Sequence, residues 1–139
     1  MTKIFIQLIT SFFGSLGFSL LFGLQKRHLF LASLGGLLSW GVYLAFISVK
    51  SNEFLACLAA SIFAMIYSEF MARVRKSPAT VFIIPSIIPL VPGSSLYYAM
   101  SSAVHGNSEQ AKFYGNETII WVLAIAGGIS FVTAVRELK

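Results

Sequence analysis

The sequence contains few of the groups that enzymes and metal sites use. Asp is absent, the five acidic residues are all Glu, and Cys57 is the only cysteine. The absence of Asp excludes an aspartyl intramembrane protease, and a single cysteine excludes an intrachain disulfide and a Cys-based metal site. No HExxH, GxSxG or Walker motif is present. The sequence therefore predicts no enzyme, no bound metal and no cofactor.

Charge is also scarce. Only 11% of the 139 residues are charged and 57% are hydrophobic, whereas a soluble domain carries about 25% charged residues. A soluble fold of this size buries too little surface to hide so many apolar side chains. We therefore expect residues 1–139 to form a single transmembrane domain in contact with the lipid bilayer.

Five long apolar runs account for most of the chain, and each is close to the roughly 20 residues that span a bilayer. Backbone groups in lipid must bond within their own segment, so we expect an all-α integral membrane protein with five transmembrane helices. The first run is longer than a signal-peptide core and lacks its cleavage site, which favours a retained helix. Residues 105–117 form the one polar connection of any length. The runs cover residues 4–24, 29–49, 54–72, 79–104 and 118–135.

Lysine and arginine are divided unevenly between the two sides of the predicted helices. One side carries seven and the other three, and the positive-inside rule assigns the seven to the cytoplasm. We therefore expect a multi-pass protein of the cell membrane with its N-terminus outside and its C-terminus in the cytoplasm. No basic stripe is interleaved with exposed aromatics, so nucleic-acid binding is not expected. The cytoplasmic set is Lys26, Arg27, Arg73, Arg75, Lys76, Arg136 and Lys139, and the outer set is Lys3, Lys50 and Lys112.

Small residues recur at helical spacing on the second and third runs. Small residues on one face let helix backbones approach closely in lipid, so these faces predict helix–helix contacts. The alternative is a chance distribution of small residues in apolar helices. The two sets are Ala32, Gly36, Ser39 and Tyr43, and Cys57, Ser61, Ala64 and Ser68.

The fourth run contains three prolines at spacings of four and three, at Pro85, Pro89 and Pro92, followed by Gly93. Each proline removes a backbone donor and clashes with the carbonyl four residues earlier. We therefore expect the fourth helix to be broken at Pro89–Gly93, within the Pro-Leu-Val-Pro-Gly sequence. A break near mid-membrane must be buried in protein or line a watery cavity. The alternative is a proline-kinked structural helix without a ligand.

A half-helix that restarts at Gly93 or Ser94 would direct free N–H groups and a positive dipole end toward the membrane centre. This geometry suits a carboxylate, as in transporters with discontinuous helices. Ser94 and Ser95 are expected either to cap the half-helix or to bond a substrate.

Glu69 is the only acidic residue within an apolar run. An intramembrane carboxylate is a candidate proton carrier, so Glu69 is a candidate for proton coupling. Arg73 follows four residues later, and an i,i+4 ion pair at the membrane surface is the alternative.

Several of these motifs together resemble the threonine/serine exporter family, specifically its small five-helix half. The central motif begins Pro78-Ala79-Thr80-Val81-Phe82 and continues through Pro85, Pro89-Leu90-Val91-Pro92-Gly93 and Tyr97. Ser68-Glu69-x-x-Ala72-Arg73 and Gly17-Phe18-x-x-Leu21-Phe22 are also similar to that family. Gly36-Leu37-Leu38-Ser39-Trp40 resembles its Gly-x-x-Gly-Trp stretch, with Ser39 in place of the second Gly.

The resemblance implies secondary export driven by the proton motive force, together with a second membrane subunit that carries the other helices. We therefore expect a hetero-oligomeric exporter of small carboxylate-bearing metabolites, either threonine and serine or a dicarboxylate such as succinate. A non-transporting assembly or scaffold subunit and a homo-oligomeric channel are the alternatives. The expected substrate-binding residues are Pro89, Pro92, Gly93, Ser94, Ser95 and Tyr97, with Glu69 in proton coupling.

The charge asymmetry predicts that Asn107 lies outside the cell and Lys76 inside it. In a Cys57→Ser background, Asn107→Cys should react with a membrane-impermeant maleimide in intact cells, because the 105–117 connection faces outward. Lys76→Cys should react only after the cells are permeabilised. Labelling in the reverse pattern would show that the chain is inserted the other way round.

Overall fold

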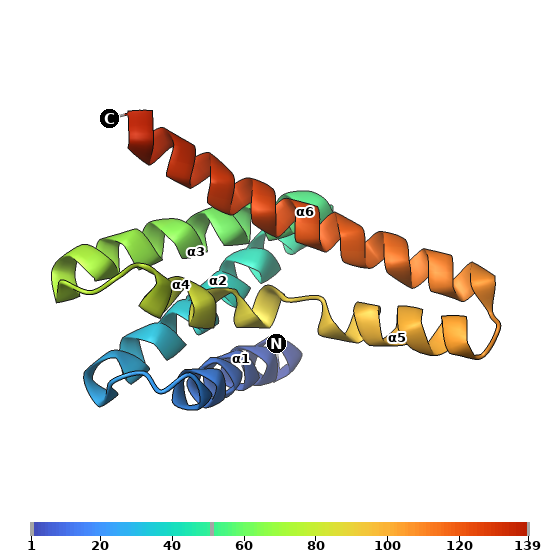
Figure 1. Ribbon diagram of the computed structural model, residues 1–139, viewed down its shortest axis with the longest axis horizontal. Helices are drawn as coiled ribbons and strands as arrows, with labels where there is room; N and C mark the ends of the chain where they lie inside the picture. The colour runs from blue at the N-terminus through green and yellow to red at the C-terminus, as the bar shows by residue number, and fades with distance from the viewer. Residues whose placement is uncertain (1, 51, 139) are drawn as a thin grey trace.

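The computed structural model describes residues 2–50 and 52–138, which fold into helices joined by short turns, with no strand in these ranges (Figure 1). Four helices are long and apolar enough to cross a membrane, and α4 with η1 and α5 form a fifth span bent by 54°. The predicted all-α membrane fold with a broken fourth helix is therefore confirmed. The helices are α1 (Thr2–Leu21), α2 (Lys26–Lys50), α3 (Glu53–Arg75), α4 (Thr80–Ile87), the 3-10 helix η1 (Ile88–Leu90), α5 (Gly93–Val104) and α6 (Ser108–Leu138).

Helix α2 is central and packs against α1, α3 and α4, while α3 also packs against α6. Helix α5 packs against the first part of α6, and the two form a hairpin that extends away from the other helices (Figure 1). No residue of α5 is buried. The core of the molecule therefore lies around α2 and α3, and α5 belongs to a projecting arm.

Small residues form the helix contacts, as the sequence predicts. Both predicted sets on α2 and α3 are buried. A Cβ added at Gly35 would lie 2.8 Å from the Tyr67 ring, and one at Gly128 would lie 3.1 Å from the Leu58 carbonyl oxygen. Ser61 then donates a hydrogen bond to the Ala124 carbonyl across the α3–α6 contact, at 3.2 Å. Close backbone approach therefore joins these helices, beside larger packed side chains such as Tyr43 and Ile125.

The prediction of a polar connection over residues 105–117 is wrong for most of that stretch. Helix α6 begins at Ser108, ten residues before the predicted start of the fifth span, and only residues 105–107 form the turn. The Asn107 side chain caps α6 by accepting the Gln110 N–H at 3.2 Å. Tyr98 of α5 packs on Tyr114 with ring centroids 5.3 Å apart. This packing against α5 stabilises the polar first turns of α6, which composition alone does not predict to be helical.

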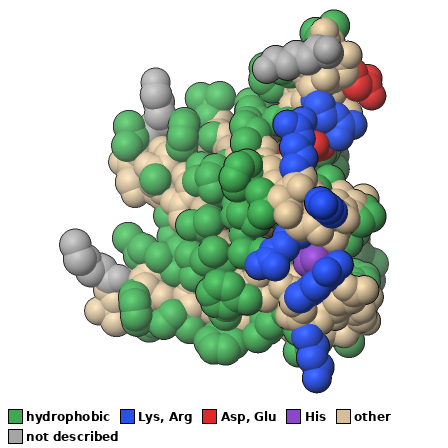
Figure 2. All heavy atoms as spheres, turned by 90° about the vertical axis from the view of Figure 1, so that its left-hand side faces the viewer, with side chains coloured by type: hydrophobic (Ala, Val, Ile, Leu, Met, Phe, Trp, Pro, Cys, Tyr) green, Lys and Arg blue, Asp and Glu red, His purple; other side chains and the backbone are tan. Residues whose placement is uncertain are grey.

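The basic residues gather at one end of the molecule. Figure 2 views the end that lies at the left of Figure 1, where Lys and Arg side chains form a band beside a largely apolar surface. They come from the α1–α2 turn, the α3–α4 turn and the end of α6. The fold thus brings together six of the seven basic residues that the sequence assigns to one side, and the seventh, Lys139, lies outside the described residues. That this side is cytoplasmic stays a prediction.

Gly36 allows α1, α2 and α4 to meet, so Gly36→Ala should destabilise the protein. The added Cβ would lie 2.7 Å from the Ser15 Cβ and 3.1 Å from the Pro85 carbonyl oxygen. Overpacking of this kind costs about 1–3 kcal/mol, and we expect a lower melting temperature in detergent. Gly17→Ala is the matched control on α1, because a Cβ there meets nothing within 4 Å. Identical melting of the two variants would contradict this packing.

Candidate functional site

The break in the fourth span lies between η1 and α5. Helix α4 contains Pro85 but continues to Ile87. The 3-10 helix η1 follows directly, and Val91 and Pro92 then adopt non-helical backbone conformations. The backbone of Val91 is extended, with φ −63° and ψ 126°. Helix α5 restarts at Gly93, as predicted. Pro89 and Pro92 both lack an N–H, so a continuous ladder of helical hydrogen bonds cannot pass through this segment.

The carbonyls that Pro89 and Pro92 release, those of Pro85 and Ile88, both accept other hydrogen bonds. The Pro85 carbonyl oxygen, which Pro89 leaves without a helical donor, accepts a buried hydrogen bond from the Ser15 hydroxyl of α1 at 2.9 Å. The Ile88 carbonyl oxygen accepts the Val91 N–H at 3.2 Å. A buried carbonyl without a partner costs roughly 1–3 kcal/mol, so these bonds make the break tolerable.

The first turn of α5 retains free donors. The Gly93 N–H is bonded to the Val91 carbonyl and the Leu96 N–H to the Pro92 carbonyl. The N–H groups of Ser94 and Ser95 have no backbone acceptor within the described ranges. The expected serine cap is not formed, because the N-cap residue of α5 is Pro92, which makes no side-chain capping bond. The Ser95 hydroxyl instead donates to Glu117 of α6 at 3.3 Å.

A cavity of about 190 Å³ opens beside this turn. Four of the predicted substrate-binding residues line it, namely Pro89, Pro92, Ser94 and Ser95. Gly93 lies between them in the chain but does not line the cavity. Tyr97 lies away from it, 67% exposed and packed edge-to-face on Tyr98. The remaining lining comes from Trp40, Glu53, Val91, Glu117 and Trp121.

Two carboxylates in this cavity were not among the predicted site residues. Glu53 begins α3 and accepts the Trp121 indole N–H at 3.4 Å, and Glu117 accepts the Ser95 hydroxyl. An aromatic row adjoins them, with Tyr43 stacked on Trp40 at 4.7 Å and 5.1 Å from Trp121. The cavity is therefore lined by two carboxylates, by aromatic rings and by the two serines whose N–H groups lack a backbone acceptor. Such a set of groups can bind an ammonium and a carboxylate together.

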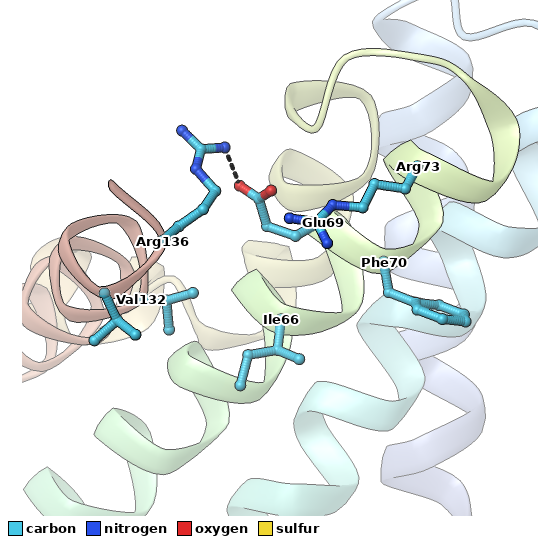
Figure 3. A pocket seen from close by; sticks show the side chains of 7 residues that line it. Ile66, Glu69, Phe70, Arg73, Val132 and Arg136 are labelled. Carbon is cyan, nitrogen blue, oxygen red and sulfur yellow. Dashed lines mark hydrogen bonds and ion pairs between the residues drawn. The ribbon is translucent and has the colours of Figure 1, made fainter. Parts of the chain in front are cut away.

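Glu69 lies in a separate groove near the other end of α3, about 24 Å along the helix from Glu53. The prediction of an ion pair with Arg73 is wrong: the Glu69 carboxylate bonds the Arg136 guanidinium of α6 at 2.6 Å (Figure 3). The Glu69 side chain is 15% exposed and that of Arg136 is 46% exposed. Arg73 reaches toward the same groove without a hydrogen bond among the described residues. Glu69 therefore joins two spans at their basic end.

A family model described as "Threonine/Serine exporter, ThrE" matches residues 7–135, which is nearly the whole chain. No solved structure matches.

Proposed function

The chain belongs to the threonine/serine exporter family, and we propose that it is the small membrane subunit of a two-component secondary exporter whose substrates are threonine and serine. The family and the membrane-spanning helices support amino-acid export. The cavity beside the broken helix is the proposed substrate site. The observation that carries the proposal is the pairing, in one cavity, of free N–H groups at the start of α5 with Glu53 and Glu117.

An amino acid carries one charge of each sign, and the proposed site offers a partner for both. The substrate carboxylate would accept hydrogen bonds from the N–H groups of Ser94 and Ser95. The helix dipole also favours negative charge at this N-terminal end of α5. The ammonium would lie against Glu53 and Glu117, beside the indole faces of Trp40 and Trp121. The side-chain hydroxyl of threonine or serine could hydrogen-bond the hydroxyls of Ser94 and Ser95, which line the same cavity.

A dicarboxylate such as succinate is the second candidate substrate, and the cavity supports it less well. Its second carboxylate would replace the ammonium and meet the two glutamates. Like charges at close range in a partly dehydrated site repel strongly. The electrostatics of the cavity thus favour an amino acid over a dicarboxylate.

The proposal of a second membrane subunit draws on the exposed surface of the hairpin. Helix α5 has no buried residue, and Tyr97, Tyr98 and Phe113 are at least half exposed. The cavity lies where this hairpin meets the other helices, so a partner placed against it would enclose the substrate. A scaffold subunit or a homo-oligomeric channel would need neither the free N–H groups nor the paired glutamates.

We further propose that Glu69 carries the coupling proton. Protonation would neutralise its carboxylate and remove the charge that holds Arg136. The contact between α3 and α6 would then loosen at the end that we expect to face the cytoplasm. This proposal includes an orientation with the N-terminus outside the cell. In that orientation the Glu69 groove faces the cytoplasm, from which an exported substrate enters.

The substrate assignment predicts that loss of a cavity glutamate lowers the efflux of threonine but not that of succinate. Cells that express the chain with its partner should export labelled threonine and serine, and cells that lack either subunit should not. Glu53→Gln and Glu117→Gln should each lower threonine efflux about tenfold, the effect of losing one charged hydrogen bond, without lowering succinate efflux. Glu109→Gln is the matched control, since Glu109 is exposed and lies outside the cavity. Wild-type threonine efflux from both cavity variants would exclude this site.

The coupling role of Glu69 predicts that Glu69→Gln abolishes the dependence of efflux on a pH gradient. Arg136→Gln breaks the same ion pair but leaves a titratable carboxylate, so it should keep that dependence. The Arg136 side chain is 46% exposed at the basic end of the molecule, so we expect the pair to contribute only about 0–1 kcal/mol and both variants to fold. The measurement is threonine efflux at several imposed pH gradients. An unchanged gradient response in Glu69→Gln would assign Glu69 a structural role only.

A further inference from the structure

The groove that contains Glu69 opens where α3 and α6 separate. The two helices are in close contact at Gly128 and Ser61, and they diverge toward their C-terminal ends (Figure 1). A groove of about 360 Å³ lies between the diverging ends (Figure 3). Its position on the outside of the helices makes it accessible from the bilayer.

The groove has an apolar wall and a positively charged end. Four apolar side chains line its length, and two of them, Ile66 and Phe70, are more than half exposed. Arg73 and Arg136 lie at its end with Glu69, so one positive charge is left over. Figure 2 shows a band of basic side chains at this end of the molecule. The apolar wall is completed by Val132 and Val135.

We propose that this groove binds an anionic phospholipid, with its phosphate at Arg73 and Arg136 and an acyl chain along Ile66 and Phe70. Apolar side chains that face a bilayer contact acyl chains, and basic pockets between membrane helices at the cytoplasmic side suit anionic headgroups. Guanidinium groups bind phosphate through paired hydrogen bonds.

Two other occupants fit the groove less well. A soluble anion would use the guanidiniums but leave the apolar wall without a function. A helix of a partner subunit would cover the wall, but it would also have to supply a carboxylate to Arg73, because an unpaired charge is costly in a membrane. A phospholipid satisfies both parts of the groove. Its phosphate would also compete with Glu69 for Arg136, so bound lipid would weaken the α3–α6 ion pair.

The test compares phosphatidylglycerol and phosphatidylcholine with identical acyl chains, each titrated onto the detergent-purified full chain and counted by native mass spectrometry. The wild type should bind phosphatidylglycerol more tightly, by about fivefold for each guanidinium that contacts the phosphate. Arg73→Gln should lower phosphatidylglycerol affinity about fivefold and leave phosphatidylcholine affinity unchanged. Arg27→Gln is the matched control, a cation at the same end but outside the groove, and should have no effect.

Three results would overturn the proposal. Equal affinity of the wild type for the two lipids would exclude headgroup recognition. Equal losses in Arg73→Gln and Arg27→Gln would indicate diffuse attraction to the basic end. Displacement of phosphatidylglycerol by glycerol 3-phosphate at similar concentration would indicate a site for soluble anions. Val135→Trp supplies a second test, because it fills the groove with the charges intact and should weaken binding of phosphatidylglycerol.

Discussion

The broken span depends on one hydrogen bond, from the Ser15 hydroxyl to the Pro85 carbonyl oxygen. A helix interrupted inside a bilayer releases carbonyls that lipid cannot satisfy, and each one left unpaired is costly. Helix α1 satisfies this carbonyl only because Gly36 allows α1, α2 and α4 to approach one another. A hydroxyl on the first helix and a missing side chain on the second thus permit the turn at Val91 and Pro92, from which the cavity follows.

The two ends of α3 differ in chemistry. At its N-terminal end, Glu53 joins Glu117 around a small cavity with aromatic walls. At its C-terminal end, Glu69 bonds Arg136 of α6 and lies in one groove with Arg73 of α3 (Figure 3). Glu53 and Glu117 line a cavity large enough for a small metabolite, and Glu69 bonds an arginine of the same protein. The same side chain type therefore lines the proposed substrate site at one end of the helix and joins two helices at the other.

Local rules in the sequence predict much of the fold. The length of the apolar runs predicts the spans, and the spacing of the prolines predicts the break. Residues spaced by four and three predict the buried faces of α2 and α3. Each of these features depends only on neighbours along one helix. The start of α6 at Ser108 was missed because packing against α5, rather than composition, stabilises its polar first turns. The Glu69 partner was wrong because Arg136 lies 67 residues away in the chain. Glu53 and Glu117 come together only when α3 and α6 are side by side, and no spacing rule indicates this.

Helix α6 is unbroken over 31 residues and contacts both carboxylate regions. Glu117 lies about 16 Å along its axis from Gly128 in one direction, and Arg136 lies about 12 Å from it in the other. Gly128 packs closely against Ser61 of α3 between these two regions. A rigid tilt of α6 by about 10° about this contact would move Glu117 by about 3 Å and Arg136 by about 2 Å in the opposite direction. Such a tilt would couple opening at one end of the molecule to closing at the other.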